Sequence, residues 1–97
     1  MDLYATLWAG MYDLALKYAQ EEAARRGVEI VDPLDPYATT EQRRLSHLEI
    51  LKVLAVMTSA LNDLEKLSRL KARSDGASFA EIGRACGISR QAARKKD

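Results

Sequence analysis

The chain has 97 residues, enough for one small domain, because a core of this size buries only about two-thirds of the surface of the unfolded chain. Its 47% hydrophobic and 30% charged residues, with a net charge of +1, are those of an ordinary soluble protein. No apolar run reaches the roughly 18 residues that span a bilayer, and one cysteine with one histidine excludes an internal disulfide and a usual zinc site. We therefore expect a cytoplasmic protein with no membrane partner, metal or cofactor.

The first helix is predicted from Asp2 to about Arg26. Two features mark its end: basic residues, which suit the negative end of a helix dipole, and Gly27, which can take a left-handed cap. The segment from Val28 to Tyr37 contains both prolines, and we expect a connector without a strand. The apolar residues that predict the helix recur every three or four positions, at Leu3, Leu7, Met11, Leu14 and Tyr18.

A second, long helix is predicted from Thr40 to about Arg73. Thr39 and Gln42 form a capping-box pattern, and no strong helix breaker follows before Gly76. Such a helix would be roughly 50 Å long. Weak helix formers between Thr58 and Asp63 leave a break in its middle open.

Apolar side chains surround the long helix between Leu45 and Leu61 instead of forming one stripe. A helix that is apolar all round is buried on all sides, and the first helix can cover only one of them. We therefore expect a homodimer in which a second protomer covers the other side. The predicted dimer interface is Leu48, Leu51, Leu54 and Met57.

The last twenty residues have the landmarks of two short helices joined by a tight turn. Ser78 and Glu81 form a capping box, and Gly87 can adopt the positive φ that a sharp turn requires. Ser89 is placed to cap the following helix. Ile82 and Cys86, four residues apart, predict the inner face of the first of these helices.

Charge is concentrated in the same region. After Leu64 the chain has nine basic and four acidic residues, a net charge of +5, whereas up to Leu64 it has six basic and ten acidic residues, a net charge of −4. A basic tail of this kind is an electrostatic footprint for a polyanion.

A helix-turn-helix places its second helix in the major groove of DNA and its first across the backbone. In that architecture Arg90, Gln91, Arg94 and Lys95 are the candidates for base contacts, and Ser78, Arg84 and Lys96 for phosphates. The end of the long helix would supply the third helix of the unit, with Leu61, Leu64, Leu67 and Leu70 packed on Phe79, Ile82, Ile88 and Ala93. The predicted DNA-binding set is Ser78, Arg84, Ser89, Arg90, Gln91, Arg94, Lys95 and Lys96.

The stretch from Arg69 to Arg94 resembles the helix-turn-helix of small bacterial regulators of an actinobacterial type. An arginine-rich helix leads into Gly-Ala-Ser, an aromatic residue, Ala-Glu-Ile-Gly-Arg-Ala, then Gly, a branched apolar residue and Ser-Arg-Gln-Ala-Ala. Where that pattern continues with an aromatic or apolar anchor, this chain has Lys95 and Lys96 after Arg94. The resemblance implies a sequence-specific regulator of transcription.

These observations predict an all-α protein. Residues 1–60 would form a helical dimerisation region, and residues 61–97 a tri-helical helix-turn-helix that binds double-stranded DNA. No catalytic motif is present, so we expect no enzyme. The alternative is a protein-interaction module, such as an antitoxin or a transcription-machinery adaptor, with a partner protein on the apolar helices. A third class, a repressor that senses a small molecule, rests only on the aromatic residues of the first helix, Tyr4, Trp8, Tyr12 and Tyr18.

Overall fold

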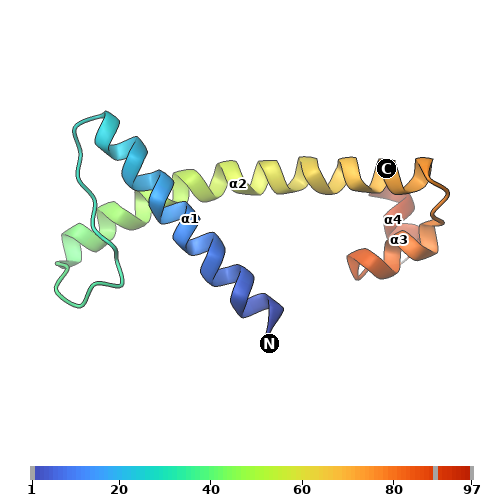
Figure 1. Ribbon diagram of the computed structural model, residues 1–97, viewed down its shortest axis with the longest axis horizontal. Coiled ribbons are helices and arrows are strands. Elements are labelled where there is room, and N and C mark those ends of the chain that lie inside the picture. Colours follow the sequence, from blue (N-terminus) through green and yellow to red (C-terminus); the bar gives the residue numbers. More distant parts are fainter. Residues whose placement is uncertain (1, 89, 97) are drawn as a thin grey trace. The chain divides into compact units, whose positions relative to one another are not determined.

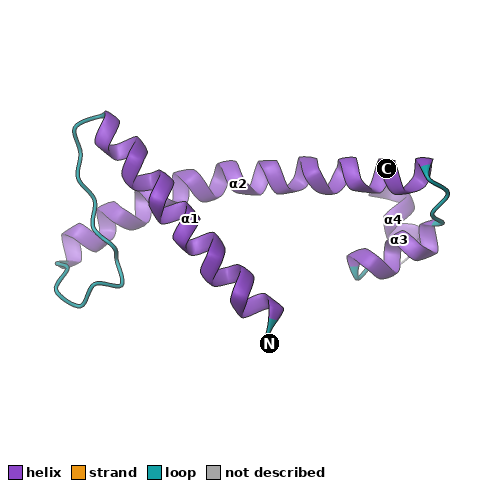
Figure 2. Ribbon diagram, viewed as in Figure 1, coloured by secondary structure: helices purple, strands orange, loops and turns teal. Residues whose placement is uncertain are grey.

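The computed structural model describes residues 2–88 and 90–96, and in this part of the chain it is all-α, with four helices and no strand (Figures 1 and 2). The predicted fold class is thus confirmed at the level of all-helical structure. None of the described helices is both long and apolar enough to cross a membrane. The helices are α1 (Leu3–Arg25), α2 (Thr40–Ser74), α3 (Phe79–Cys86) and α4 (Arg90–Lys96).

The chain divides into two compact units, Met1–Met57 and Thr58–Asp97, which are described separately below. The helix α2 contributes to both and is unbroken, so the break that the sequence left open does not occur. Threonine, serine and asparagine in its middle lower helix propensity by only tenths of a kcal/mol each and remove no backbone hydrogen bond. We call the two units the N-terminal unit and the C-terminal unit.

Local signals at both ends set the bounds of α1. The carboxylate of Asp2 accepts a hydrogen bond from the Tyr4 amide at 3.0 Å, which caps the first turn. At the other end Gly27 has a φ of +75°, and the Val28 amide donates to the Ala23 carbonyl at 2.9 Å. The predicted left-handed glycine cap of α1 is therefore confirmed.

A capping box starts α2, as predicted. The Gln42 side chain accepts from the Thr39 amide at 2.8 Å, and the Thr39 hydroxyl accepts from the Gln42 amide at 3.1 Å. The half-buried Arg43 donates to the Ala38 carbonyl and ties the end of the connector to this first turn. At its far end α2 stops before Gly76, which has a φ of +96°.

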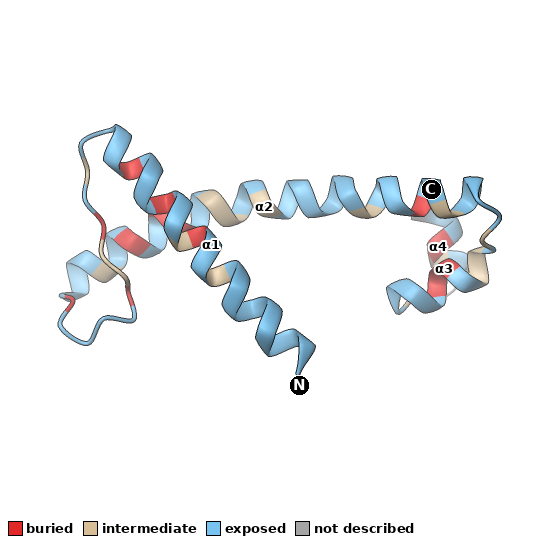
Figure 3. Cartoon of the chain, viewed as in Figure 1, coloured by how far each residue is buried: buried red, intermediate tan, exposed pale blue. Residues whose placement is uncertain are grey.

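The core of the N-terminal unit lies where α1 meets α2. The face of α1 that points into this core consists of small side chains, and an alanine projects little beyond the backbone. Figure 3 shows these buried positions on the second half of α1. The core residues are Ala15, Ala19 and Ala23 of α1, each fully buried, with Ile30 of the connector and Ile50 of α2.

Two polar contacts hold this unit together around its core. The buried carboxylate of Glu49 accepts from Arg26 at 2.5 Å and from Lys52 at 3.0 Å, and the bonds to Lys52 and then Arg26 lower its pKa. The Tyr12 hydroxyl donates to Asp32 at 3.0 Å, which ties α1 to the connector. Burial, and then this bond to a carboxylate, raises the pKa of Tyr12 to about 12.

The four residues predicted for the dimer interface have different environments. Leu48 and Leu51 are 52% and 57% exposed. Leu54 and Met57 are half-buried because they pack against the core formed with α1. Only the first two therefore leave a large apolar surface to solvent.

We expect Ser46→Ala to stabilise the N-terminal unit. Ser46 is fully buried in α2, and its hydroxyl has no hydrogen-bond partner among the residues that the structure describes. Alanine removes this unsatisfied group and is the better helix former, so the free energy of unfolding should rise by about 1 kcal/mol. Denaturant unfolding measures the change, and a loss of stability would mean that the hydroxyl is satisfied in solution.

Candidate nucleic-acid interface

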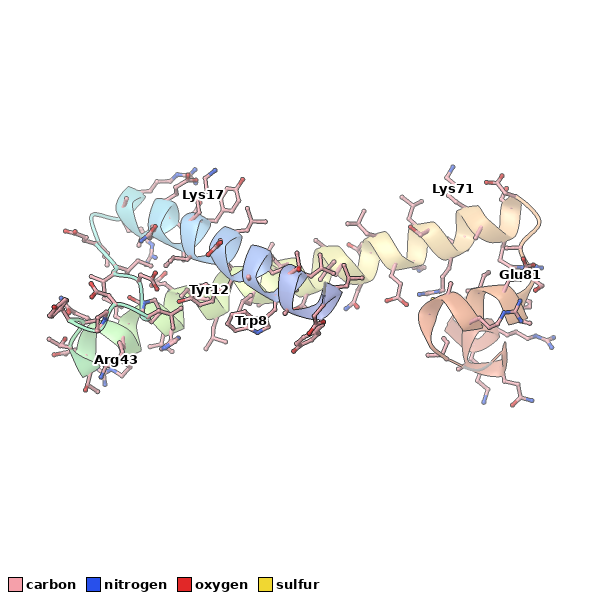
Figure 4. The ribbon with its side chains drawn as sticks, turned by 60° about the horizontal axis from the view of Figure 1, so that its bottom comes forward. Trp8, Tyr12, Lys17, Arg43, Lys71 and Glu81 are labelled. Atoms are coloured by element: carbon pink, nitrogen blue, oxygen red, sulfur yellow. The ribbon has the colours of Figure 1, made fainter. Side chains whose placement is uncertain are left out.

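The capping box predicted at the start of α3 is present. The Ser78 hydroxyl accepts from the Glu81 amide at 3.0 Å, and the Glu81 carboxylate accepts from the Ser78 amide at 2.9 Å. The Ser78 backbone bond, and then the bond to its side chain, lowers the pKa of Glu81. Figure 4 shows Glu81 at the beginning of this helix.

A glycine turn ends α3. Gly87 has φ and ψ of 68° and 28°, a left-handed conformation, and the Ile88 amide donates to the Gly83 carbonyl at 2.8 Å. This is the predicted turn, and glycine is required there because a side chain would be strained at that φ. The following helix, α4, begins only three residues later.

The two short helices pack on each other through small and branched side chains. In α3, Ile82 is only 4% exposed and the neighbouring Gly83 is also buried. In α4, Ala93 is fully buried. Ile88, in the turn, is half-buried. The inner face predicted from Ile82 is thus correct, and it fixes α4 relative to α3.

An arginine at the end of α2 holds the start of α3. The guanidinium of Arg73 lies 4.2 Å from the ring centroid of Phe79 and donates to the Ala77 carbonyl at 2.6 Å. Cation–π contacts of this kind stabilise by about 0.5–1 kcal/mol at exposed sites. Sequence reasoning missed this contact, although a basic residue in the last turn of one helix and an aromatic residue opening the next were its visible signal.

Exposed polar side chains gather on one face of α4. Gln91, Arg94 and Lys95 are all exposed, and their spacing of three and four residues puts them on neighbouring positions of the helix surface. Arg84, also exposed, ends α3 just before the turn. From Phe79 to Lys96 the chain has five basic residues and one acidic residue, so this surface is strongly positive.

The other predicted DNA-binding residues are either already hydrogen-bonded within the chain or outside the described part of the structure. The Ser78 amide, expected to favour a phosphate, is already bonded to the Glu81 carboxylate, whose negative charge lies beside it. This leaves Ser78 only its hydroxyl proton to offer a phosphate. Ser89 lies outside the described residues, as do the side chains of Arg90 and Lys96.

Two expectations about packing were wrong. Cys86 was predicted on the inner face of α3 but is exposed, because it stands in the last residue of that helix, beside the turn that leads the chain away. The four leucines of the second half of α2 were predicted to pack on α3 and α4, yet each remains about half exposed. Their three-residue spacing turns each by about 60° from the last, so one partner surface cannot cover them all. They are Leu61, Leu64, Leu67 and Leu70, at 54%, 59%, 51% and 47% exposure.

The buried residue of this part of α2 is instead Arg69. It is 8% exposed and pairs with Glu65 at 2.8 Å, four residues earlier. Arg73 lies on the ring of Phe79, so two cations of the basic tail, Arg69 and Arg73, make contacts within the chain. The positive surface is therefore narrower than the sequence count implies, and it centres on α4 and the end of α3.

No family model, curated protein or solved structure matches this chain. Among the described residues there is no group of three or more His, Cys, Asp or Glu side chains that could hold a metal ion.

The stability of the C-terminal unit should depend on the charge of Glu81. Its lowered pKa means that the ionised carboxylate stabilises the folded state above the pKa of the unfolded chain. This stabilisation should be lost as the pH falls through the lower, folded pKa. Glu81→Gln keeps an acceptor for the cap but cannot titrate. Below the ordinary pKa range of glutamate, we expect its melting temperature to change less with pH than that of the unaltered protein. Parallel pH profiles of both proteins would refute the assignment.

Proposed function

We propose that the C-terminal unit binds double-stranded DNA as a helix-turn-helix, with α4 in the major groove and α3 across the backbone. The observation that carries this proposal is the exposed face of Gln91, Arg94 and Lys95 on a helix fixed by the buried Ala93 and Ile82. This mode of recognition requires a positive, solvent-facing helix that follows a tight turn.

The chemistry of this face suits base edges as well as phosphates. Arginine can pair with guanine through two hydrogen bonds and glutamine with adenine, each worth about 1–3 kcal/mol of discrimination. Lys95 and Arg84 can neutralise phosphates on either side of the groove. An α-helix such as α4 is about 10–12 Å across with its side chains, which fits a major groove about 12 Å wide.

In this proposal the protein is a homodimeric regulator of transcription. A two-fold dimer presents two copies of α4 to half-sites about one helical turn apart, so its operator would be close to a palindrome. Supporting this, two leucines of the N-terminal unit, Leu48 and Leu51, stay exposed in the part of the chain that the structure describes.

The experiment is selection of bound sites from a random pool of DNA duplexes at physiological salt, followed by sequencing. We expect a two-fold symmetric motif to be enriched. A folded protein that enriches no sequence would contradict the proposal.

The exposed leucines also favour a second candidate, a module that binds another protein, such as an antitoxin or an adaptor. Sedimentation of the pure protein separates the two. A stable homodimer covers its apolar surface with itself, whereas a monomer that enriches no DNA sequence keeps that surface for a different protein.

A further inference from the structure

The helix α1 has a second apolar face in addition to its alanine face. The five residues of this face, which we call the α1 stripe, are spaced by four, four, three and four positions, and the stripe lies roughly 120° around the helix from the alanines. All are exposed, and Figure 3 shows the first half of α1 in solvent. The α1 stripe is Leu3, Leu7, Met11, Leu14 and Tyr18, at 67%, 52%, 39%, 44% and 45% exposure.

Two aromatic residues, Trp8 and Tyr12, continue the alanine face of α1 towards the start of the helix and do not belong to the stripe. Trp8 and Tyr12 stack with ring centroids 5.6 Å apart and an interplanar angle of 7°, and Trp8 is 51% exposed. In Figure 4 both rings leave α1 on the side opposite Lys17, which belongs to the polar face. Among the described residues, α1 therefore has a polar side, an alanine side that Trp8 and Tyr12 prolong, and the α1 stripe, which stays exposed.

A groove adjoins the second half of the α1 stripe. It has a volume of about 630 Å³ and runs between α1 and α2 within the N-terminal unit. Its apolar walls are Leu14 and Tyr18 of the stripe with Val53, Val56 and Met57 of α2, and its charged end holds Glu22, Arg26, Glu49 and Lys52.

The chain as a whole, including the exposed leucines of the second half of α2, leaves more surface exposed than compact monomeric proteins do. The chain exposes 7454 Å². Two compact monomeric proteins of the sizes of the two units would together expose about 6,600 Å², so the excess is about 800 Å². A standard interface buries about the same area, 800 Å², on each partner.

We propose that a second copy of this chain covers this surface, with the two α1 helices packed antiparallel about a two-fold axis near Gly10 and Met11. This deepens the homodimer of the proposed function and rests on it for its role in DNA binding. Met11 lies near the middle of the α1 stripe, eight residues after Leu3 and seven before Tyr18, so an antiparallel register centred there can bury the whole stripe. Leu3 then meets Tyr18 of the second copy, and Leu7 meets Leu14 of the second copy.

The position of the groove favours antiparallel over parallel packing. The groove lies beside the second half of the stripe, at Leu14 and Tyr18, and Leu3 and Leu7 of the first half do not line it. Antiparallel packing inserts the first half of one α1 into the groove of the other, so both uncovered surfaces are buried at once. Parallel packing would leave the first halves to meet only each other.

Gly10 supports the place of the axis. A glycine weakens the middle of a helix, and a Cβ at Gly10 would meet no atom within 4 Å, so packing inside the chain does not require it. At the proposed axis the missing side chain leaves room for Met11 of the second copy.

Disulfide trapping in a Cys86→Ser background tests the arrangement. We expect Met11→Cys to form a covalent dimer with a mild oxidant, because position 11 lies close to its own copy. Leu7→Cys alone should stay monomeric on a non-reducing gel, since its two copies are separated by about 10 Å along the axis, beyond disulfide reach. A mixture of Leu7→Cys and Leu14→Cys should form covalent dimers. Efficient self-trapping of both Leu7→Cys and Leu14→Cys would overturn the proposal in favour of parallel packing.

Sedimentation supplies the second readout. Met11→Lys should be monomeric, whereas the matched control Ala9→Lys, at an exposed position on the far side of α1, should remain a dimer. Circular dichroism checks that both are folded. A dimeric Met11→Lys overturns the proposal. We expect monomeric Met11→Lys still to bind one half-site, at least tenfold more weakly than the dimer binds two. This result would show that the variant has lost dimerisation and not DNA binding itself.

Discussion

Replacing Arg84, Arg94 and Lys95 together with alanine should lower the affinity for any DNA duplex several hundredfold at about 0.1 M salt. Each cation that neutralises one phosphate contributes about 0.9 to the slope of log affinity against log salt concentration, so the slope should become shallower by about 2.7. The three side chains are exposed, and the change should leave the fold of the C-terminal unit intact. Fluorescence anisotropy over a salt series measures both quantities.

A matched control removes the same number of charges elsewhere. Lys17, Arg25 and Arg44 are exposed cations of the N-terminal unit, and the proposed interface with DNA does not include them. Their triple alanine variant should bind with nearly unchanged affinity and slope. Equal losses in the two triple variants would mean that net charge, and not the face of α4, binds DNA.

Ile82→Ala should unfold the C-terminal unit. Truncating a buried isoleucine costs about 2–5 kcal/mol. A unit that comprises only residues 58–97 has little stability to spare, because a core of this size is at the lower limit for independent folding. We expect loss of DNA binding and of amide-exchange protection in α3 and α4, with protection in α1 retained.

The control for this variant is Cys86→Ala, which changes an exposed residue of the same helix. It should bind DNA as the unaltered protein does. Wild-type binding by Ile82→Ala would contradict the role assigned to this side chain as the anchor between α3 and α4.

Helix bounds could be predicted from sequence because the signals that set them are local. The capping pairs Thr39 with Gln42 and Ser78 with Glu81 act within one turn, and Gly27 and Gly87 adopt the left-handed conformation that their positions required. Each is decided by neighbours along the chain, which a sequence displays directly.

Local signals did not predict which apolar faces are buried, or against which surface. Periodicity identified the stripe of α1, but it did not distinguish that face from the alanines, which are the residues that α2 buries. Likewise, the four leucines of α2 from Leu61 to Leu70 are apolar but about half exposed, whereas Arg69 is charged but buried. Burial depends on which surface lies opposite, and several arrangements of the same helices satisfy one pattern.

The three left-handed glycines also bear on how this chain folds. Gly27, Gly76 and Gly87 each end a helix through bonds to carbonyls at most five residues away. Contacts of such short sequence separation form early and at little entropic cost, and proteins rich in them fold in microseconds to milliseconds. The helices of this chain should therefore be complete before much of its apolar surface is covered. For the proposed homodimer, we expect the slow, concentration-dependent step of folding to be the association of two chains.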